Sequence, residues 1–301
     1  MLQGNKTGMI YTFHRITGEP LIPIEEKPVP QSAVPGEQLS PTQPFPTAPP
    51  PVVRQAPIST DDAWGLMLVD EWMCRREIQR YRSEGIFTPP SLQGTLMLPG
   101  YGGGINWGGI AFDPVREMAV VNANELPTIV SLVPREDYPS LDAGALGTGA
   151  NAAEQAGTPD GLWRIPLLSI ISVPCITPPW GTITAVDMTS GTIAWQKPLG
   201  TIEDIAPSAV PDLELGTPGM GGPIITASGL IFVGTAMDNY LRALDIKNGK
   251  ELWRGRLPAS AQATPMSYFD SGTGKQYIVI AAGGHSGLGT KAGDYLVAFS
   301  L

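Results

Sequence analysis

The sequence is poor in histidine, cysteine and charged residues. Its 301 residues include two His, two Cys and only 16% charged side chains, against roughly a quarter charged in an average soluble domain. Two histidines exclude a multi-histidine metal site, and the low charge excludes a coiled coil and a charged disordered tail. The 36 Gly and 31 Pro instead predict frequent turns and little helix.

Basic charge and long apolar runs are also scarce. The 19 Lys and Arg against 28 Asp and Glu give a net charge of −9, and we expect no nucleic-acid partner because phosphate binding requires a basic surface. The longest apolar stretches, such as Pro166–Pro174, fall short of the roughly 20 residues of a membrane-spanning helix. Residues 1–13 lack the charged and apolar regions of a secretory signal and are typical of β-strand from the start.

The two cysteines, Cys74 and Cys175, form no CxxC motif. In a reducing compartment they would be buried free thiols, and in an oxidising compartment they would form a single disulfide. The residues alone leave both alternatives open.

One short pattern, A-x-D-x3-G-x3-W, occurs twice in the second half of the chain. The copies are Ala185–Trp195 and Ala243–Trp253, degenerate copies lie at residues 12–22, and the opening of another lies at 297–300. The spacing predicts a β-hairpin in which a strand ends at Asp, D-x3-G turns, and the next strand delivers Trp to the space between sheets.

Short apolar runs at residues 230–234 and 277–282 predict further strands after the repeats. Four short strands per unit with a Trp near one hairpin are typical of a propeller blade. A β-sandwich and a solenoid also repeat, but the Trp spacing favours an all-β propeller.

Two segments interrupt the repeats and are interpreted as insertions at about residues 28–90 and 138–179. Residues 28–57 are rich in Pro, which predicts an extended, partly polyproline-like surface connection. The second insertion is rich in Gly, Ala and Pro and contains Cys175.

The first insertion contains the one short helix that the sequence predicts. Ser59–Asp62 supplies an N-cap, Gly85 supplies a stop, and Trp64, Leu68 and Trp72 share one face. Arginines fill its last turns, where a cation suits the helix dipole without any ligand.

Glycine-rich segments do not match the common catalytic motifs. Residues 283–289 resemble a nucleophile elbow, but Leu288 stands where a glycine is required. Gly102–Gly104 is not a dinucleotide fingerprint, because Trp107 occupies the position of the third glycine, and no G-K-[ST] follows any glycine loop. Nucleotide binding is therefore disfavoured.

Four polar residues lie next to glycine-rich turns: Lys6, Asn122, Asp238 and His285. Each one taken alone is best interpreted as a surface, turn or loop residue. Together they predict a binding site, because glycine beside a polar residue lets a planar ligand approach the backbone.

The Trp repeats, with Leu98–Gly100 and Asn106–Gly109, closely resemble the quinoprotein dehydrogenases that use pyrroloquinoline quinone (PQQ). The chain is similar to their membrane-bound glucose dehydrogenase branch, whose members include polyol and quinate enzymes. The other matching segments are residues 6–8, 26–31, 41–45, 84–90, 238–242, 255–258 and 262–266.

The resemblance implies that residues 1–301 are the C-terminal part of a single PQQ-binding domain, about half of an eight-bladed propeller. It implies that Lys6 contacts the quinone oxygens, Asn122 reaches the cofactor edge, Trp107 lines the same funnel, and Asp238 also binds the cofactor. His285 is expected in the vicinity of substrate and cofactor.

In the same family, hydride passes from a sugar or polyol carbinol to PQQ, a carboxylate removes the hydroxyl proton, Ca²⁺ or Mg²⁺ polarises the quinone, and ubiquinone accepts the electrons. The general base, most metal ligands and the membrane anchor lie upstream of the lysine that Lys6 matches. We therefore expect no catalytic residue and no metal ligand in this chain, and an isolated chain that is inactive and poorly soluble.

The expected partners are the missing N-terminal half of the propeller, a sugar or polyol substrate and ubiquinone. The resemblance implies a periplasmic protein held at the membrane by an anchor that this chain lacks, and it favours a disulfide between Cys74 and Cys175. The alternatives are a quinate or polyol enzyme and, in another class, a non-catalytic propeller scaffold for protein binding.

Overall fold

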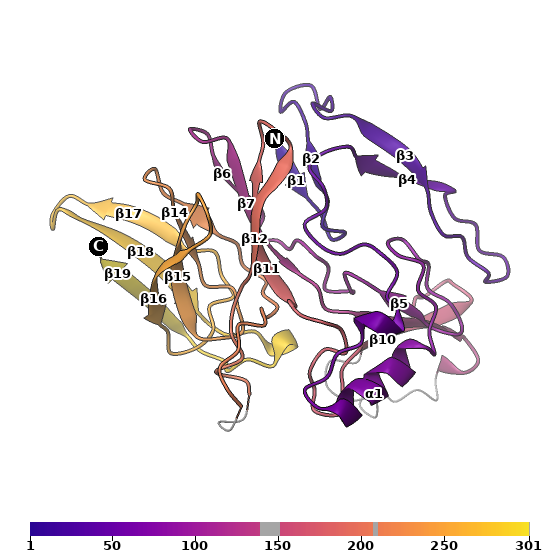
Figure 1. Ribbon diagram of the computed structural model, residues 1–301. Helices are drawn as coiled ribbons and strands as arrows, with labels where there is room; N and C mark the ends of the chain where they lie inside the picture. The colour runs from indigo at the N-terminus through magenta and orange to yellow at the C-terminus, as the bar shows by residue number, and fades with distance from the viewer. Residues whose placement is uncertain (139–150, 207–209, 301) are drawn as a thin grey trace.

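The structure is a computed structural model that describes residues 1–138, 151–206 and 210–300. Small antiparallel sheets follow one another along the chain, with a single α-helix at one side (Figure 1). The sheets of the described residues do not close into a ring. The expected mostly β architecture is confirmed, and the blade number of a complete propeller stays a prediction.

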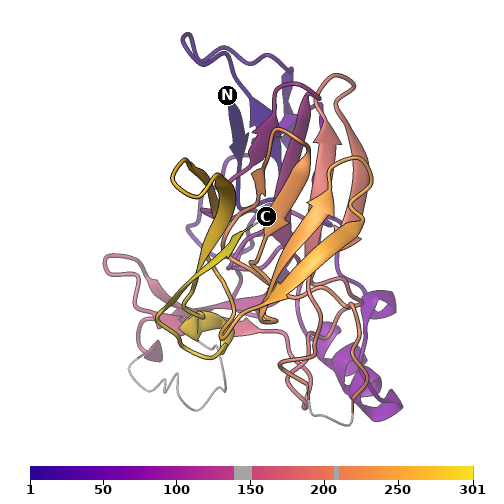
Figure 2. The same cartoon turned by 90° about the vertical axis from the view of Figure 1, so that its left-hand side faces the viewer.

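Four sheets stand in the manner of propeller blades. Two have four strands, a third has three, and the first has two (Figures 1 and 2). In sheet order they are β1 (Leu2–Gly4) and β2 (Ile10–Thr12); β6 (Ala111–Asp113), β7 (Met118–Asn124), β11 (Gly181–Asp187) and β12 (Thr192–Pro198); β13 (Ile224–Ile225), β14 (Leu230–Val233), β15 (Tyr240–Asp245) and β16 (Glu251–Arg256); and β17 (Met266–Asp270), β18 (Lys275–Ala282) and β19 (Tyr295–Ser300).

The two repeats form the β11–β12 and β15–β16 hairpins, as their spacing predicts. In the first turn, the Asp187 carboxylate accepts the backbone N–H groups of the residues two and three positions later, at 2.8 and 3.2 Å. These hydrogen bonds lower the pKa of Asp187. Gly191 closes the turn with a left-handed φ of 68°, and Gly249 does so in the second hairpin with a φ of 66°, a conformation that favours glycine.

The repeat tryptophan joins neighbouring blades. Trp195 Nε1 donates to the carbonyl of Ile246 at 2.8 Å, and its ring covers Gly249, where a Cβ atom would lie 2.7 Å from ring atoms. The glycine of one repeat is therefore also the seat for the tryptophan of the preceding repeat. The equivalent Trp253 packs edge-on against Phe299 at 5.0 Å and is 40% exposed.

Apolar side chains between adjacent sheets form the core. Alternate residues of β7 point to opposite faces, so Val120 packs toward the following sheet while Ala119 and Val121 pack toward the preceding one. Phe232, with residues of β15 and β18, fills the next space between sheets. This alternation fixes the register, because a shift of one residue would exchange the two faces.

The first insertion contains a β-ribbon of β3 (Ile24–Pro28) and β4 (Thr42–Pro46). The expected polyproline-like connection over residues 28–57 is therefore partly β-strand. Proline is tolerated because both strands of a two-stranded ribbon are edge strands, which need only one side for ladder hydrogen bonds.

The two insertions build one additional sheet together. Its order is β5 (Thr95–Met97), β8 (Thr128–Pro134), β10 (Asp160–Pro166) and β9 (Asn151–Ala153). The chain leaves the blade directly after β7 and returns to it at β11. The second insertion therefore begins earlier than the predicted residue 138. A shared core packs below the sheet, with members from both insertions: Ile58, Cys74, Ile78, Leu96, Ile129, Leu167, Ile176 and Trp180.

The predicted helix is shorter than expected and buries another face. Ser59 caps only a 3-10 turn, η1 (Thr60–Asp62), and the α-helix α1 (Leu68–Ile78) begins later. The expected apolar face is wrong: the side chains of Leu68 and Trp72 are 85% and 54% exposed, whereas Asp70, Cys74 and Ile78 are buried.

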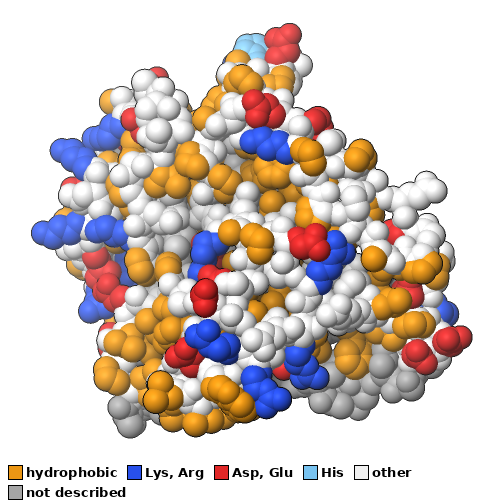
Figure 3. Space-filling view, turned by 45° about the vertical axis from the view of Figure 1, so that its right-hand side comes forward, with side chains coloured by type: hydrophobic (Ala, Val, Ile, Leu, Met, Phe, Trp, Pro, Cys, Tyr) orange, Lys and Arg blue, Asp and Glu red, His pale blue; other side chains and the backbone are white. Residues whose placement is uncertain are grey.

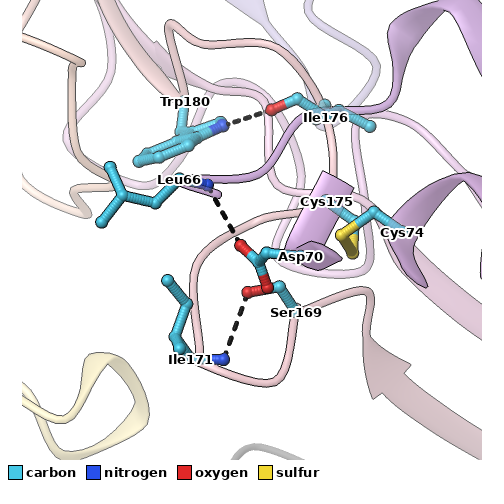
Figure 4. Close-up of a disulfide and its surroundings, with 8 residues drawn as sticks. All are labelled: Leu66, Asp70, Cys74, Ser169, Ile171, Cys175, Ile176 and Trp180. Carbon is cyan, nitrogen blue, oxygen red and sulfur yellow. Dashed lines mark hydrogen bonds between the residues drawn. A yellow bond between two sulfur atoms is a disulfide. The ribbon is translucent and has the colours of Figure 1, made fainter. Parts of the chain in front are cut away.

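Covalent and polar contacts explain this orientation (Figure 4). Cys74 is bonded to Cys175, with 5.1 Å between their Cα atoms, and this disulfide ties α1 to the second insertion. The Asp70 carboxylate accepts the N–H of Leu66 at 3.1 Å, in front of the helix. Both contacts hold the Asp70–Cys74 face inward. No helix in the described ranges is long and apolar enough to cross a membrane.

Candidate functional site

The four polar residues singled out from the sequence lie at corresponding places in four successive sheets. Lys6 is in the β1–β2 turn, Asn122 is near the end of β7, Asp238 is between β14 and β15, and His285 is between β18 and β19. The connections that hold Lys6, Asp238 and His285 lead into strands that open a complete or degenerate Trp repeat, and β7, which holds Asn122, pairs with β11, the strand that opens the first complete repeat. The fold therefore places the four residues at the same end of the blades.

Lys6 lies at the tip of a tight turn that leans on the loop before β6. Its Nζ donates to the carbonyl of Gly102 at 2.7 Å and to Oδ1 of Asn106, and its own carbonyl accepts the N–H of Gly104 at 2.7 Å. Partial burial lowers the pKa of Lys6. Its ammonium has no carboxylate partner in the described part of the chain, so one of its three N–H groups is free for a ligand.

Asn106 is a site residue that reasoning from single residues missed, although it stands in the same motif as Trp107. Its Oδ1 holds Lys6, and its Nδ2 is buried without a partner. Trp107 is 69% exposed and lies beside Gly108, whose missing Cβ would stand 2.2 Å from the backbone of residues 221 and 222. Glycine is needed there because two loops of the same face touch.

Asn122 and Asn124 share one face of β7 and differ in their contacts. Both polar atoms of the Asn124 side-chain amide are used. Nδ2 donates to the carbonyl of Gly219 at 2.9 Å, and Oδ1 accepts the backbone N–H of Gly219 at 2.9 Å. Asn122 is buried as well, but its amide makes no side-chain hydrogen bond among the described residues and is not fully withdrawn from solvent. The amide of Asn122 can therefore bond to a ligand, whereas Asn124 joins two loops.

Asp238 is fully buried, and protein groups occupy both its carboxylate oxygens. Arg242 donates to Oδ1 at 2.9 Å and also to Oδ2, which in addition accepts the N–H of Thr201 at 2.7 Å. Burial acts to lower the pKa of Arg242, but the Asp238 carboxylate raises it overall. The contacts of Asp238 are thus structural, and its role toward a cofactor stays a prediction.

His285 precedes a short 3-10 helix, η4 (Ser286–Leu288). Its backbone N–H donates to Oγ1 of Thr290 at 2.7 Å, and Gly284 donates to the carbonyl of Ser260 at 2.9 Å, which fixes the loop. The ring nitrogen Nδ1 is buried without a partner. His285 therefore presents an imidazole that is positioned by its backbone and available on its ring.

Comparisons with known proteins show the family to which the chain belongs. The family model "Glucose/ethanol/alcohol dehydrogenase, beta-propeller domain", labelled PQQ, matches residues 1–278. The chain belongs to the PQQ β-propeller dehydrogenase family. It is 44% identical over 303 residues to the quinoprotein glucose dehydrogenase of Escherichia coli K12, and 40% identical over 305 residues to the quinate/shikimate dehydrogenase (quinone) of Acinetobacter baylyi.

These alignments cover 98% and 99% of this PQQ-family chain but 38% of each relative. The chain thus spans less than two-fifths of the length of the curated relatives it matches. Among solved structures, it is similar to quinohemoprotein alcohol dehydrogenase from Comamonas testosteroni, with a TM-score of 0.53, 17% identity, and coverage of 99% of this chain and 35% of that one. A europium-containing methanol dehydrogenase gives 0.52 and 20%, with coverage of 94% and 36%. Both likenesses show the propeller fold alone.

The residues present in this PQQ-family chain fit a planar, oxygen-rich cofactor. Orphaned polar atoms of Asn106 and His285, the free amide of Asn122 and the unpaired ammonium of Lys6 can all donate hydrogen bonds. Within the ranges that the structure describes, no three His, Cys, Asp or Glu side chains gather as a metal site. The site can therefore bind and polarise a ligand through hydrogen-bond donors.

Two cavities of the described residues are lined by other residues. One of about 530 Å³ is lined by Leu2, Thr12, Phe112 and neighbours, and one of about 120 Å³ by Arg54, Ile176 and neighbours. On the face drawn in Figure 3, Lys and Arg side chains are interspersed with Asp and Glu. The candidate site is thus recognised from unpaired donors and loop contacts rather than from a deep cavity.

Proposed function

We propose that this chain is the C-terminal part of a PQQ-dependent dehydrogenase that oxidises glucose or a related sugar or polyol. The observation that carries the proposal is the placement of Lys6, Asn122 and His285, each with a free polar group, at the same end of successive blades. PQQ, when bound, accepts the hydride from the substrate carbinol.

Each residue has a distinct role in this proposal. Lys6, oriented by Gly102 and Asn106, holds the quinone oxygens, where a cation stabilises negative charge that develops on reduction. Asn122 donates to the cofactor edge, Trp107 covers its ring, and His285 faces the substrate. Asp238 fixes Arg242 and the Thr201 loop beside the site.

The remaining parts of the reaction are assigned to a polypeptide that precedes this segment. That part supplies the carboxylate general base and most ligands of a Ca²⁺ or Mg²⁺ ion, and it completes the propeller. The assembled enzyme is periplasmic, is held at the membrane by an N-terminal anchor, and passes electrons to ubiquinone. The support for two parts is the 38% coverage of the curated relatives.

A quinate or polyol substrate is the second candidate. The quinate/shikimate dehydrogenase of Acinetobacter baylyi is 40% identical, and the glycerol dehydrogenase large subunit of Gluconobacter thailandicus is 37% identical, close to the 44% of the glucose enzyme. Sequence identity therefore favours glucose only slightly over quinate or glycerol as the substrate.

The proposal is tested by assembling this chain with the upstream region of the Escherichia coli glucose enzyme. We expect PQQ-dependent dye reduction from the assembly and none from the chain alone, because the general base is upstream. Lys6→Met should weaken PQQ binding in an absorbance titration, while Lys275→Met, which changes an exposed lysine of β18, should not. Turnover by the chain alone, or equal PQQ affinity of both variants, would contradict the proposal.

The scaffold alternative makes the opposite prediction. A non-catalytic propeller has no reason to bind PQQ, so neither the chain nor the assembly would show a Lys6-dependent titration.

A further inference from the structure

Arg164 on β10 is an unusual cation in this structure. Among the described residues, it is the one lysine or arginine that is partly buried and has no carboxylate within ion-pair distance. Its Nη2 donates to the neutral Oδ1 of Asn151, and its Nε is buried without a partner. Burial lowers the pKa of Arg164.

The guanidinium lies over an aromatic ring at the candidate site. Its Cζ atom is 3.6 Å from the centre of the Tyr101 ring, and stacking of this kind orients a guanidinium while leaving its edge free. The backbone N–H of Tyr101 donates to Oγ1 of Thr128 at 3.2 Å, which fixes the ring-bearing loop to β8. The inserted sheet thus brings an arginine to the loop that holds Lys6.

The two cations contact successive residues of that loop. Arg164 stacks on Tyr101, and the Lys6 ammonium bonds to the carbonyl of Gly102. Lys6 and Arg164 are also the two basic residues of the described ranges whose pKa is lowered overall, in each case by burial. Two neighbouring cations without carboxylate partners, in a chain of net charge −9, leave a local positive charge that a bound anion would compensate.

We propose that Arg164, stacked on Tyr101, binds a carboxylate of the ligand that enters the Lys6 site. This inference rests on the proposed function for the place of the site. A guanidinium edge matches a carboxylate by paired hydrogen bonds. The carboxylate belongs either to PQQ, which carries three, or to an acidic substrate of the quinate kind.

The test uses the full chain and four probes: PQQ, its trimethyl ester, quinate and glucose. Binding of the two quinones is followed by fluorescence quenching and binding of the others by calorimetry. Arg164→Gln should weaken a carboxylate probe roughly tenfold or more, as expected for a charged hydrogen bond, and leave its neutral counterpart unchanged. Arg164→Lys should recover part of the loss. Arg135→Gln is the matched control, because Arg135 lies at the same sheet but pairs with Glu154 at 3.5 Å.

The outcomes separate the two sources of the carboxylate. Loss confined to PQQ, with the ester unaffected, assigns Arg164 to the cofactor, and loss confined to quinate assigns it to the substrate. Equal binding of all probes by Arg164→Gln and the unsubstituted chain would overturn the inference, as would an unsubstituted chain that does not distinguish carboxylates from neutral probes. If PQQ and its ester still bind in a Lys6-dependent manner, the proposed function stands without this subsite.

Discussion

Loss of the Cys74–Cys175 disulfide should strongly destabilise the inserted sheet and its core. The two cysteines are 101 residues apart in sequence, and a closed loop of roughly 100 residues corresponds to about 4.7 kcal/mol in the chain-entropy model. Both side chains are buried in the core that the two insertions share. We expect reduction of the bond to lower the free energy of unfolding by about 2–5 kcal/mol.

Urea unfolding followed by tryptophan fluorescence measures this loss. Trp64 and Trp180 pack edge to face at 5.2 Å, and Trp180 lies in the same core as the disulfide, so their emission reports on this region. With a urea dependence of about 3 kcal/mol/M, a loss of 4.7 kcal/mol would move the midpoint by roughly 1.5 M.

Comparing the reduced chain with the double variant Cys74→Ala/Cys175→Ala separates the effect of the cross-link from the effect of the buried sulfur atoms. Reduction removes the cross-link and leaves the buried volume unchanged, whereas the variant also creates small cavities, so its midpoint should be somewhat lower. A midpoint in reduced chain that corresponds to a loss below about 1 kcal/mol would refute the argument from loop closure.

Five other substitutions, two matched pairs and one alone, test contacts of the fold and one titration. Trp195→Phe should cost about 1 kcal/mol through its lost hydrogen bond, and Trp253→Phe should cost less, because Trp253 is partly exposed; equal urea midpoints would contradict this. Gly8→Ala should destabilise the chain more than Gly18→Ala. Both glycines have a φ of 77°, but only at Gly8 would a Cβ atom clash, 2.2 Å from the side chain of Val53. Equal melting temperatures of the two variants would contradict the clash. Burial, and then a hydrogen bond to Glu77, raise the pKa of Tyr81 to about 12. The tyrosine of the unfolded chain ionises first, near pH 10, so the free energy of unfolding should fall between about pH 10 and 12. The urea midpoints of Tyr81→Phe should lack that fall.

The repeats could be predicted from the sequence because their physics is local. Asp187 and Gly191 form a turn among neighbours in the chain, and the spacing to Trp195 follows from the length of one strand. The spacing predicted that this tryptophan enters the space between sheets. Its partner, the carbonyl of Ile246, lies 51 residues away and is known only from the fold.

The inserted sheet and the helix face could not be predicted in the same way. Strand β8 pairs with β5 and β10 from distant segments. Its apolar, β-branched residues are typical of a strand, but they do not tell which strands it pairs with. The buried face of α1 is set by the disulfide of Cys74 and the capping contact of Asp70. The apolar face that contains Trp72 did not predict the buried side of α1, because the disulfide fixes the orientation of the helix.

Lys6, Asn122 and His285 were singled out from the sequence, and their role toward a ligand stays a prediction. Asn106 and Arg164 were missed because their significance lies in contacts across 100 residues or between insertion and blade. The sequence does not show whether a basic residue forms an ion pair with a carboxylate in the folded chain. Only the fold shows that Arg164 is partly buried and has no ion-pair partner among the described residues.

The placement of the second insertion inside a blade affects the order of folding. β7 and β11 pair along their whole lengths, but residues 125–180 separate them in the chain, whereas β14 and β15 are joined by a short turn. Closing a long loop is slower and entropically more costly than closing a short one. The third blade sheet can therefore nucleate by itself during folding, while the blade that contains Asn122 must wait until the inserted sheet has brought β7 and β11 together.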